Sequence, residues 1–326
     1  MAFMAVLESD LRALSAEARR RYPAVKDAAE HAILKLRSLS SPSEIAHSED
    51  ILNIFLMACE VRTVKLSVIG LSCLQKLISH DAVAPSALKE ILNTLKDHSE
   101  MADESLQLKT LQTILIIFQS SLQPDNEENT AQALGICLRL LESNRSSDSV
   151  RKSLEQEFTS GTSTLTRNTL TKPGKLGHRL LEDLAALAAN GSATWLRVGS
   201  LQRTFVLDIL EFILSNYVVL FRTLIPYEEV LRHQIFSLLM TSLRTDSEFE
   251  GETGEPYFRR LVLRSVAHII RLYSSSLITE SEVFLSMLVR AISLDLPLWH
   301  RILVLEILRV TPRICCKQIM HCKFIK

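Results

Sequence analysis

The chain has 326 residues, of which 47% are hydrophobic and 23% are charged, a composition typical of a folded globular protein. Lysine plus arginine and aspartate plus glutamate both number 37, so no net charge draws the whole molecule to nucleic acid or to an anionic membrane. Only 9 glycines and 9 prolines occur, which disfavours glycine-rich phosphate loops and β folds with many turns, and favours helices.

The six cysteines do not form a disulfide framework. Cys59, Cys73 and Cys137 fall inside apolar helical runs, and the other three are bunched near the C-terminus. Glu8 and Asp10 follow a short apolar start without a small-residue cleavage site, which disfavours a secretory signal. The apolar runs are shorter than the roughly 20 residues of a membrane span. We therefore expect a cytosolic protein.

A helical hairpin is predicted over residues 7–39, the first element of the chain. Each of its helices carries apolar residues at steps of three and four, the spacing of one helix face: Leu7, Leu11, Leu14 and Ala18, then Val25, Ala29, Ala32 and Leu36. Pro23 suits the first turn of the second helix. Two short amphipathic helices joined by a tight turn leave an apolar face that a further hairpin must cover.

The same pattern continues through the first half of the chain. Helices are predicted to begin near Ser48, Thr63, Pro85, Asp103 and Glu128. They recur at intervals of about 20 residues, as in paired-helix repeats with periods of about 40. Between Ser143 and Gly177 the sequence is polar and rich in serine, threonine and glycine, which predicts a linker.

Helical spacing resumes in the second half, where six further helices are predicted: Leu176–Leu187, Leu201–Leu224, Pro226–Leu239, Val262–Tyr273, Thr279–Leu288 and Pro297–Leu305. The second of these carries two apolar stripes, which predicts a helix packed on two sides: Leu201, Phe205, Ile209 and Phe212, then Val206, Leu210 and Ile213. Thr279 and Glu282 have the spacing of a capping box. The last helix carries Leu298, Ile302 and Leu305 at helical spacing.

These patterns predict an all-α fold, an armadillo/HEAT-like superhelix of stacked helical hairpins. Four regions are expected: a helical repeat region over 1–142, a polar flexible linker over 143–175, a second helical repeat region over 176–310, and a divergent tail over 311–326 that has lost the leucine periodicity.

No catalytic, cofactor-binding or metal-binding residue is predicted. Four residues in the tail could be soft metal ligands, but their spacing matches no paired-ligand pattern, and a plain tail is favoured: Cys315, Cys316, His321 and Cys322. The remaining histidines are scattered, with no HExxH or Ser-His-Asp arrangement. Trp195 and Trp299 are interpreted as core residues or wedges between repeats.

Two basic clusters are candidate interaction surfaces. The first, near the first predicted turn, could contact an anionic membrane or cap the end of a helix: Arg12, Arg19, Arg20, Arg21 and Lys26. The second is a stripe at steps of four, four and three: Arg260, Arg264, His268 and Arg271. The stripe could receive an acidic partner, a phosphoinositide head group or the chain's own acidic loop at Glu248–Glu255, although an ordinary solvated helix face is favoured.

Several segments resemble one family. Ser9–Ser15 and Tyr22–Glu30 resemble the N-terminus of the Mon-two (monensin sensitivity two) proteins, Sec-seven-less relatives of the large Arf guanine-nucleotide exchange factors. Leu106–Phe118 is similar to a later helix of the same dimerisation and cyclophilin-binding (DCB) region, and Ile278–Arg309 resembles the homology-upstream (HUS) region that follows. The resemblance covers most of residues 5–310, so that 1–142 would be DCB-like and 176–310 HUS-like.

The resemblance implies a non-enzymatic scaffold in vesicle trafficking that is cytoplasmic and peripheral on trans-Golgi network and endosome membranes. Its implied partners are Dopey-type proteins, flippase-type lipid pumps, Arf-like GTPases and a second copy through the DCB-like region, with no cofactor and no nucleic acid. The alternative is a generic cytosolic armadillo-like adaptor that recognises extended peptides. An exchange enzyme would need a catalytic helical domain that the sequence does not reveal.

Overall fold

A computed structural model of the chain describes residues 2–19, 21–39, 44–45, 49–124, 126–142, 170–199, 201–244, 256–292 and 296–309. All regular structure within these ranges is helical, and none of it is β-strand, so the predicted all-α fold is confirmed. Contacts divide the chain into two compact units. The N-terminal unit comprises Met1–Thr162 with Leu196–Val198, and the C-terminal unit comprises Ser163–Trp195 with Gly199–Lys326.

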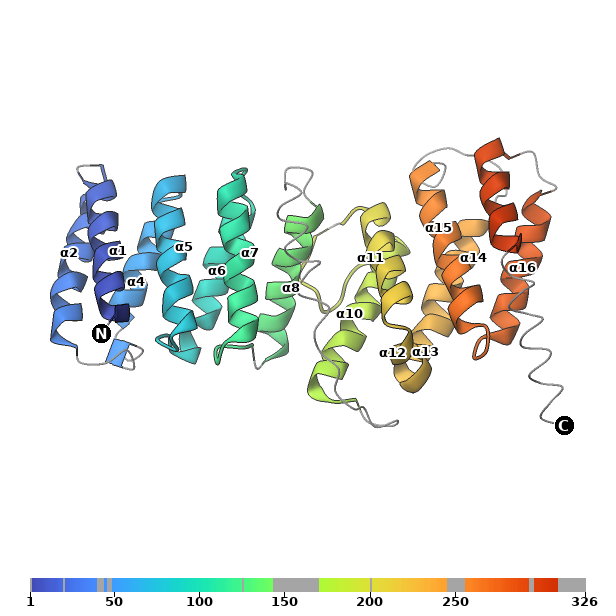
Figure 1. The fold of residues 1–326 in the computed structure, drawn as a ribbon, viewed down its shortest axis with the longest axis horizontal. Helices are drawn as coiled ribbons and strands as arrows, with labels where there is room; N and C mark the ends of the chain where they lie inside the picture. The colour runs from blue at the N-terminus through green and yellow to red at the C-terminus, as the bar shows by residue number, and fades with distance from the viewer. Residues whose placement is uncertain are drawn as a thin grey trace. The chain divides into compact units, whose positions relative to one another are not determined.

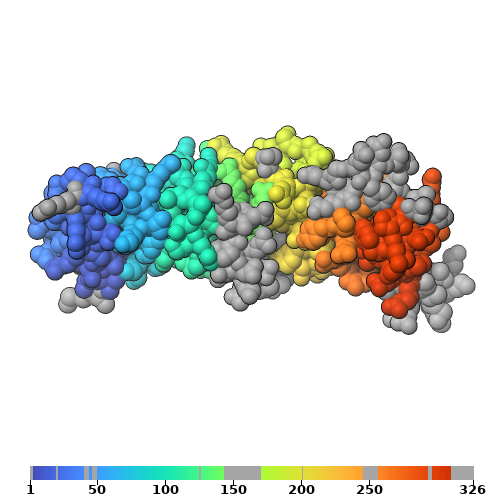
Figure 2. All heavy atoms as spheres, turned by 90° about the horizontal axis from the view of Figure 1, so that it is seen from above, coloured from blue at the N-terminus to red at the C-terminus, as the bar shows by residue number. Residues whose placement is uncertain are grey.

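The N-terminal unit is a stack of helical hairpins in two layers. Its helices are α1 (Ala2–Ala18), α2 (Pro23–Ser38), α4 (Glu49–Glu60), α5 (Val64–Ser79), α6 (Leu88–Ser99), α7 (Glu104–Gln119) and α8 (Glu127–Glu142). One layer runs from α1 through α5 to α7, and the other runs from α2 through α4 and α6 to α8 (Figure 1). In the space-filling view the colours of this unit run from dark blue to teal in chain order, because each hairpin packs on the preceding one (Figure 2).

The first hairpin forms as predicted. All eight apolar positions of its two stripes are buried in the joint face of α1 and α2. Pro23 is in the first turn of α2, where the missing N–H costs no helical hydrogen bond. Arg19, with a φ of 36°, ends α1 in the left-handed region and turns the chain toward α2.

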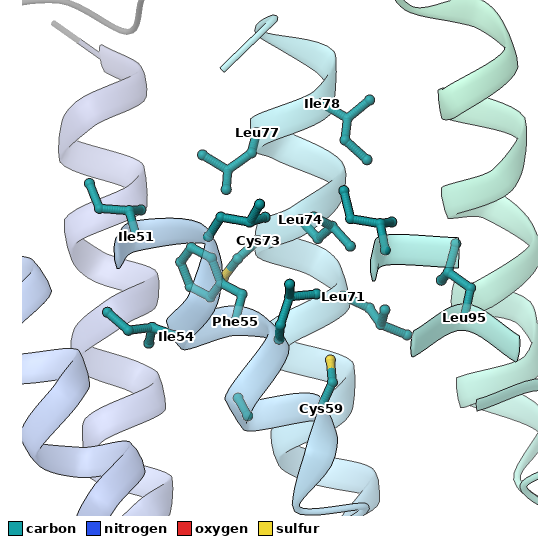
Figure 3. Close-up of a cluster of buried hydrophobic side chains, with 14 of the residues drawn as sticks. Ile51, Ile54, Phe55, Cys59, Leu71, Cys73, Leu74, Leu77, Ile78 and Leu95 are labelled. Carbon is teal, nitrogen blue, oxygen red and sulfur yellow. The ribbon is translucent and has the colours of Figure 1, made fainter. Parts of the chain in front are cut away.

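The middle of the N-terminal unit is a continuous apolar core. Figure 3 shows side chains of α4, α5 and α6 converging on it, with Phe55 of α4 facing Leu74 of α5 and the sulfur of Cys73 among them. Gly70 lets α4 and α5 approach closely, since a Cβ at this position would lie 3.0 Å from the Phe55 carbonyl oxygen. Burial of these apolar side chains is the main term that stabilises such a stack.

The sequence located one helix start in this unit from its capping residue. Asp103 accepts a hydrogen bond from the backbone N–H of Leu106 at 3.0 Å, as an N-cap of α7 should. Hydrogen bonds from Ser105 and Leu106 hold the pKa of the Asp103 carboxyl below its usual value, so the cap is charged at neutral pH.

The C-terminal unit has the same architecture with more interruptions. Its helices are α10 (Lys172–Ala188), α11 (Arg203–Asn216), α12 (Val218–Thr223), α13 (Ile225–Val230), α14 (Phe236–Leu243), α15 (Pro256–His268) and α16 (Ile278–Ile292). Two π-helical stretches join α13 to α14 and extend α15: Leu231–Ile235 and Ile269–Tyr273. Residues 298–309 form a further helix. In this unit α11 packs on α10 and α15, and α14 packs on α15 and α16.

Aromatic residues hold the middle of the C-terminal unit. The ring of Phe221 lies edge-on to Tyr227 and Tyr273, with ring centres 6.1 and 5.7 Å away. Tyr273 is fully buried and donates its hydroxyl hydrogen to the Leu214 carbonyl at 2.7 Å. Burial raises the pKa of Tyr227 to about 12, so its hydroxyl remains a hydrogen-bond donor.

Helix α10 begins earlier than predicted. The sequence places its start at Leu176 because the preceding segment is polar and rich in serine, threonine and glycine, but the helix begins at Lys172 and is capped by Thr171. Gly177 is inside this helix for a packing reason: a Cβ there would lie 2.5 Å from the Tyr227 hydroxyl. Gly177, which this close contact requires, falls at the end of the segment that the sequence predicts as a linker.

Two predictions on helix faces and ends in the C-terminal unit were wrong. Residues 201–224 are not one helix packed on two sides, since α11 ends at Asn216 and α12 follows. The face of α11 that is buried carries Val206 and Leu210, while Phe212 of the other stripe is 41% exposed. Thr279 is not a cap, because α16 already begins at Ile278.

Several predictions fall outside the described residues. These are most of the linker, the acidic loop, and the tail, at residues 143–169, 245–255 and 310–326. The limits proposed for the four regions therefore stay predictions. Among the helices that are described, none is long and apolar enough to cross a bilayer.

Candidate interaction surfaces

The first basic cluster contains an acidic residue that sequence reasoning missed. Glu8, one turn before Arg12 on α1, accepts hydrogen bonds from Arg12 Nη2 at 2.6 Å and from Arg37 Nη2 of α2 at 2.7 Å. The Arg37 and Arg12 guanidiniums hold the pKa of the Glu8 carboxyl at about 2. Half the charge of this arginine pair is therefore neutralised within the hairpin. Arg37 lies 25 positions beyond Arg12, so helix spacing alone gives no sign that they share a partner.

The other members of the cluster lie at the turn between α1 and α2. Arg19 and Arg21 are exposed there, and Arg20 lies outside the described residues. Lys26 is within 3.3 Å of Glu30 on the same helix. The turn thus presents Arg19 and Arg21 to solvent beside a largely paired helix face, and its role as a contact surface stays a prediction.

The basic stripe on α15 is built around a buried glutamate of α11. Glu211 has only 8% of its side chain exposed, and its Oε1 lies 2.8 Å from His268 Nε2 and 3.1 Å from Arg264 Nη2. Arg271 Nη2 is 3.4 Å from His268 Nδ1. The contact between α11 and α15 thus brings Glu211 to Arg264 and His268 as their counter-ion. The sequence also suggested the acidic loop at Glu248–Glu255 as a partner of the stripe. That loop lies outside the described residues.

Arg260, the first residue of the stripe, contacts an aromatic ring. Its guanidinium carbon lies 5.3 Å from the ring centre of Trp299, within the range of a cation–π interaction. Next to this pair is a hollow of about 310 Å³ lined by Arg260, Arg264, Trp299, Ile302, Leu303 and Glu306. Trp299 was expected in the core or as a wedge, and the structure places it at the wall of this hollow.

A second, smaller hollow of about 150 Å³ lies in the N-terminal unit. Its wall is polar and carries Lys89, Asn93, Lys96, Glu128, Gln132, Ile136, Arg139 and Arg197. Arg197 is 3.0 Å from Glu128, and Arg139 is 3.3 Å from Glu100, so both arginines are engaged within the unit. The wall of this hollow is formed by side chains of α6, α8 and the segment at 196–198.

One serine–histidine pair occurs in the described part of the chain, and it is enclosed. His98 Nε2 lies 3.0 Å from Ser67 Oγ, and Nδ1 lies 2.7 Å from the Thr94 carbonyl. A carbonyl can only accept, so Nδ1 carries the proton, and Ser67 donates to Nε2. Both residues are buried, and burial lowers the pKa of His98. The hydrogen-bond direction is the one that a nucleophilic serine would need, but Ser67 and His98 are 0% and 2% exposed, so a substrate has no access and the pair serves packing.

The remaining reactive groups are also structural. Cys59, Cys73 and Cys137 are free and buried, and burial raises the pKa of Cys59 and of Cys137 to about 12. The described ranges contain no group of three or more His, Cys, Asp or Glu side chains that could hold a metal ion. The tail cysteines and His321, considered as ligands from the sequence, lie beyond these ranges.

Comparison with known proteins assigns both halves of the chain. A family model described as Mon2/Sec7/BIG1-like, dimerisation and cyclophilin-binding domain, matches residues 1–153. A second, described as the Mon2/Sec7/BIG1-like HUS domain, matches residues 177–316. The chain belongs to the Mon2/Sec7/BIG1-like family. The order of the two domains is the one that the sequence resemblance led us to expect.

Curated relatives in this family carry the name MON2. The chain is 28% identical over 345 aligned positions to Protein MON2 homolog of Xenopus laevis and to that of Homo sapiens, in each case over 92% of this chain and 20% of the relative. It is 25% identical to Protein MON2 of Saccharomyces cerevisiae over 93% of this chain. The chain therefore spans about one fifth of the length of the relatives it matches.

The segments that carried the family resemblance lie on packed helices. Ser9–Ser15 is in α1, Tyr22–Glu30 leads into α2, and Leu106–Phe118 is in α7. Ile278–Arg309 covers α16 and the helix at 298–309. The resemblance therefore rests largely on residues that build the stack of this family and says little about which exposed residues bind a partner.

Proposed function

We propose that this chain is a non-enzymatic scaffold in Golgi and endosome vesicle trafficking, acting as a peripheral protein on trans-Golgi network and endosome membranes. The proposal rests on the DCB and HUS domain matches, which follow each other along the chain. It rests also on the similarity to MON2 proteins over most of this chain. By this resemblance its partners are Dopey-type proteins and Arf-like GTPases, and the DCB-like region forms a homodimer.

The architecture supports binding rather than catalysis. Stacked helical hairpins expose long ridges of side chains, on which partners gain affinity from a few apolar or arginine anchors. The residues proposed to contact partners are those of the two basic clusters, with Arg20 known from the sequence alone: Arg12, Arg19, Arg20 and Arg21 in the first, and Arg260, Arg264 and Arg271 in the second. The family descriptions name a dimerisation and cyclophilin-binding domain and no reaction.

Fluorescent tagging of the chain in cells tests the location. We expect a juxtanuclear signal that overlaps trans-Golgi markers and disperses when the Golgi is disrupted. A diffuse signal that is insensitive to Golgi disruption would refute the trafficking role and favour the generic peptide-binding adaptor.

Nucleotide-release assays on Arf-like GTPases test the absence of exchange activity. We expect this chain, added at a lower concentration than the GTPase, to slow the release of bound nucleotide or to leave it unchanged. Catalytic acceleration of release by this chain would contradict the proposal, and pull-downs with the same GTPases would then distinguish binding from turnover.

A further inference from the structure

A row of three polar residues on α6 lines the smaller hollow, the one in the N-terminal unit. Lys89, Asn93 and Lys96 follow at steps of four and three, the spacing of one helix face. Both lysines are exposed, and neither has an ion-pair or hydrogen-bond partner within the part of the chain that the structure describes. This face of α6 therefore presents two ammonium groups that the packing of the unit does not use.

The opposite wall of the hollow holds two arginines in fixed positions. Arg139 Nη1 lies 3.3 Å from Glu100 Oε1, and its Nη2 donates to the Arg197 carbonyl at 3.3 Å. Arg197 Nη2 in turn lies 3.0 Å from Glu128 Oε1. The two glutamates offset the charge of these arginines and keep their side chains at the wall, so each arginine is oriented before any ligand arrives.

A side-chain amide lies between the two lysines and is also oriented. Gln132 Nε2 of α8 donates to Asn93 Oδ1 of α6 at 2.9 Å. Because the Asn93 oxygen accepts this hydrogen bond, its amide nitrogen keeps two N–H groups that can donate to a ligand. The hollow thus combines uncharged and cationic donors on the α6 side.

The charge around the hollow matches that of a phosphate group. Four cations line it, and two of them are offset by glutamates, so two positive charges remain. A phosphate monoester carries about −1.5 to −2 at neutral pH and has three strong acceptor oxygens, whereas a carboxylate carries a single charge. A hollow of about 150 Å³ has room for several water molecules, and therefore for one phosphorus and its oxygens.

Exposed acids beside the hollow favour a phosphorylated protein segment over an anionic membrane. Glu90 and Asp97 are exposed on α6, each directly after one of the two lysines. Their carboxylates repel a continuous layer of lipid phosphates, but they attract basic side chains that flank a single phosphorylated residue. The surroundings therefore select the sequence around the phosphate.

We propose that the hollow between α6 and α8 binds a phosphoserine or phosphothreonine of a partner protein whose flanking residues are basic. The phosphate oxygens accept hydrogen bonds from Lys89, Lys96 and the Asn93 amide, and the two arginines close the opposite wall. The flanking basic residues face Glu90 and Asp97. This site depends on the N-terminal unit alone, so it stands or falls independently of the trafficking role.

Fluorescence anisotropy of a labelled peptide tests the site on the full chain. The probe is a short peptide with a phosphoserine between two lysines, in a background of alanine and glycine. We expect it to bind at least about tenfold more tightly than the same peptide with serine. It should also bind more tightly than the peptide with glutamate, which supplies one negative charge in place of two. Equal affinities of the phosphoserine and serine peptides would overturn the proposal.

Substitutions on α6 assign the binding to the hollow. Asn93→Asp places a carboxylate between the two lysines and keeps the oxygen that accepts from Gln132. It should weaken binding of the phosphopeptide about tenfold or more, and so should the double variant Lys89→Gln with Lys96→Gln. The three substituted side chains are exposed, so circular dichroism should show an unchanged fold. Phosphopeptide binding that Asn93→Asp leaves unaltered would rule out the hollow as the site.

A control variant and two further ligands complete the test. Lys26→Gln with Lys65→Gln removes the same amount of charge from α2 and α5, and this chain should bind the phosphopeptide as the parent does. Inorganic phosphate that displaces the peptide at an equal concentration would overturn the protein partner, because a free anion would then suffice. Binding to vesicles that contain phosphoinositides, dependent on Lys89 and without peptide binding, would overturn it in favour of a membrane.

Discussion

Glu211 is the residue on which the α11–α15 contact depends electrostatically. A carboxylate this deeply buried is tolerated only because His268 and Arg264 both reach it. Replacing it with a neutral side chain removes the negative charge that His268 and Arg264 share.

We predict that Glu211→Gln lowers the free energy of unfolding by about 1–2 kcal/mol, because glutamine keeps the size of the side chain and loses its charge. Urea unfolding followed by tryptophan fluorescence measures the change. Asp97→Asn is the control, since Asp97 pairs with Arg62 where both side chains are more than half exposed, and it should cost a few tenths of a kcal/mol. If Glu211→Gln and Asp97→Asn lowered the free energy of unfolding equally, the buried pairing of Glu211 would stabilise the chain no more than an exposed ion pair does.

His98 makes stability depend on pH in a defined direction. Burial lowers its pKa in the folded chain, so below the ordinary value of about 6.5 the unfolded chain binds the proton more readily. Stability is therefore complete above pH 6.5 and is lost as the pH falls toward the folded pKa. Burial and the nearby Arg259 also lower the pKa of His300, so this residue adds a further loss of stability as the pH falls.

We predict that the free energy of unfolding falls between pH 7.5 and pH 5.5, by at most about 1.4 kcal/mol per pH unit for each such histidine. His98→Leu should reduce this fall without abolishing it, because His300 remains. Denaturant unfolding followed by circular dichroism at the two pH values measures both. His233→Gln controls for loss of an exposed histidine, and a pH dependence unaltered by His98→Leu would contradict the assignment.

At the scale of elements, helix α10 is held to α13 by one close approach. Tyr227 donates its hydroxyl hydrogen to the Gly174 carbonyl at 2.9 Å, and the same hydroxyl lies against Gly177, where a Cβ would be 2.5 Å away. Glycine at 177 is therefore a steric requirement, whereas a Cβ at Gly174 would meet only the Thr171 hydroxyl oxygen, at a tight 3.3 Å, and the side chain of Leu170.

We predict that Gly177→Ala destabilises the C-terminal unit by about 1–3 kcal/mol, because the added methyl group overpacks the contact with Tyr227. Gly174→Ala in the same helix should cost less, since alanine favours the helix and its methyl group meets only the Thr171 hydroxyl oxygen at 3.3 Å. Thermal unfolding of the two variants gives the comparison. A Gly177→Ala chain as stable as Gly174→Ala would show that the two helices separate at little cost.

The elements show where sequence reasoning succeeds and where it stops. Periodicity located the stripes of the first hairpin because every apolar residue there faces one neighbour, and Asp103 marked a helix start through a local hydrogen bond. Periodicity cannot say what covers an apolar stripe. Leu298, Ile302 and Leu305 have the spacing of core residues, but their side chains are exposed. Glu211 was missed because its partners lie more than 50 residues away.

At the scale of the molecule, the family match and the surfaces come from different residues. The match depends on residues that build the helices of each unit, whereas the pairing of Glu211 on α11 with Arg264 and His268 on α15 became visible only when helices far apart in sequence were placed together. A scaffold's partners are chosen by such composite surfaces, which no single stretch of sequence contains.

The N-terminal unit is completed by a segment distant in sequence. Val198 lies close to Gly135 on α8, and Arg197 pairs with Glu128. We predict that the double variant Arg197→Ala and Val198→Ser exchanges amide hydrogens faster in α8, while α1 is unchanged. Hydrogen exchange followed by mass spectrometry measures both in one experiment, and unaltered protection of α8 would show that the segment adds nothing to the unit.

This segment also affects the order in which the chain can fold during synthesis. Residues 196–198 leave the ribosome after all of α10, which belongs to the other unit. The hairpins from α1 to α7 can assemble one upon another as they emerge, but α8 waits for its final neighbours until the next unit has begun to form. The folding of the two units therefore overlaps in time, and a nascent chain that pauses after α8 has emerged but before residues 196–198 have emerged would expose the flank of α8 to chaperones.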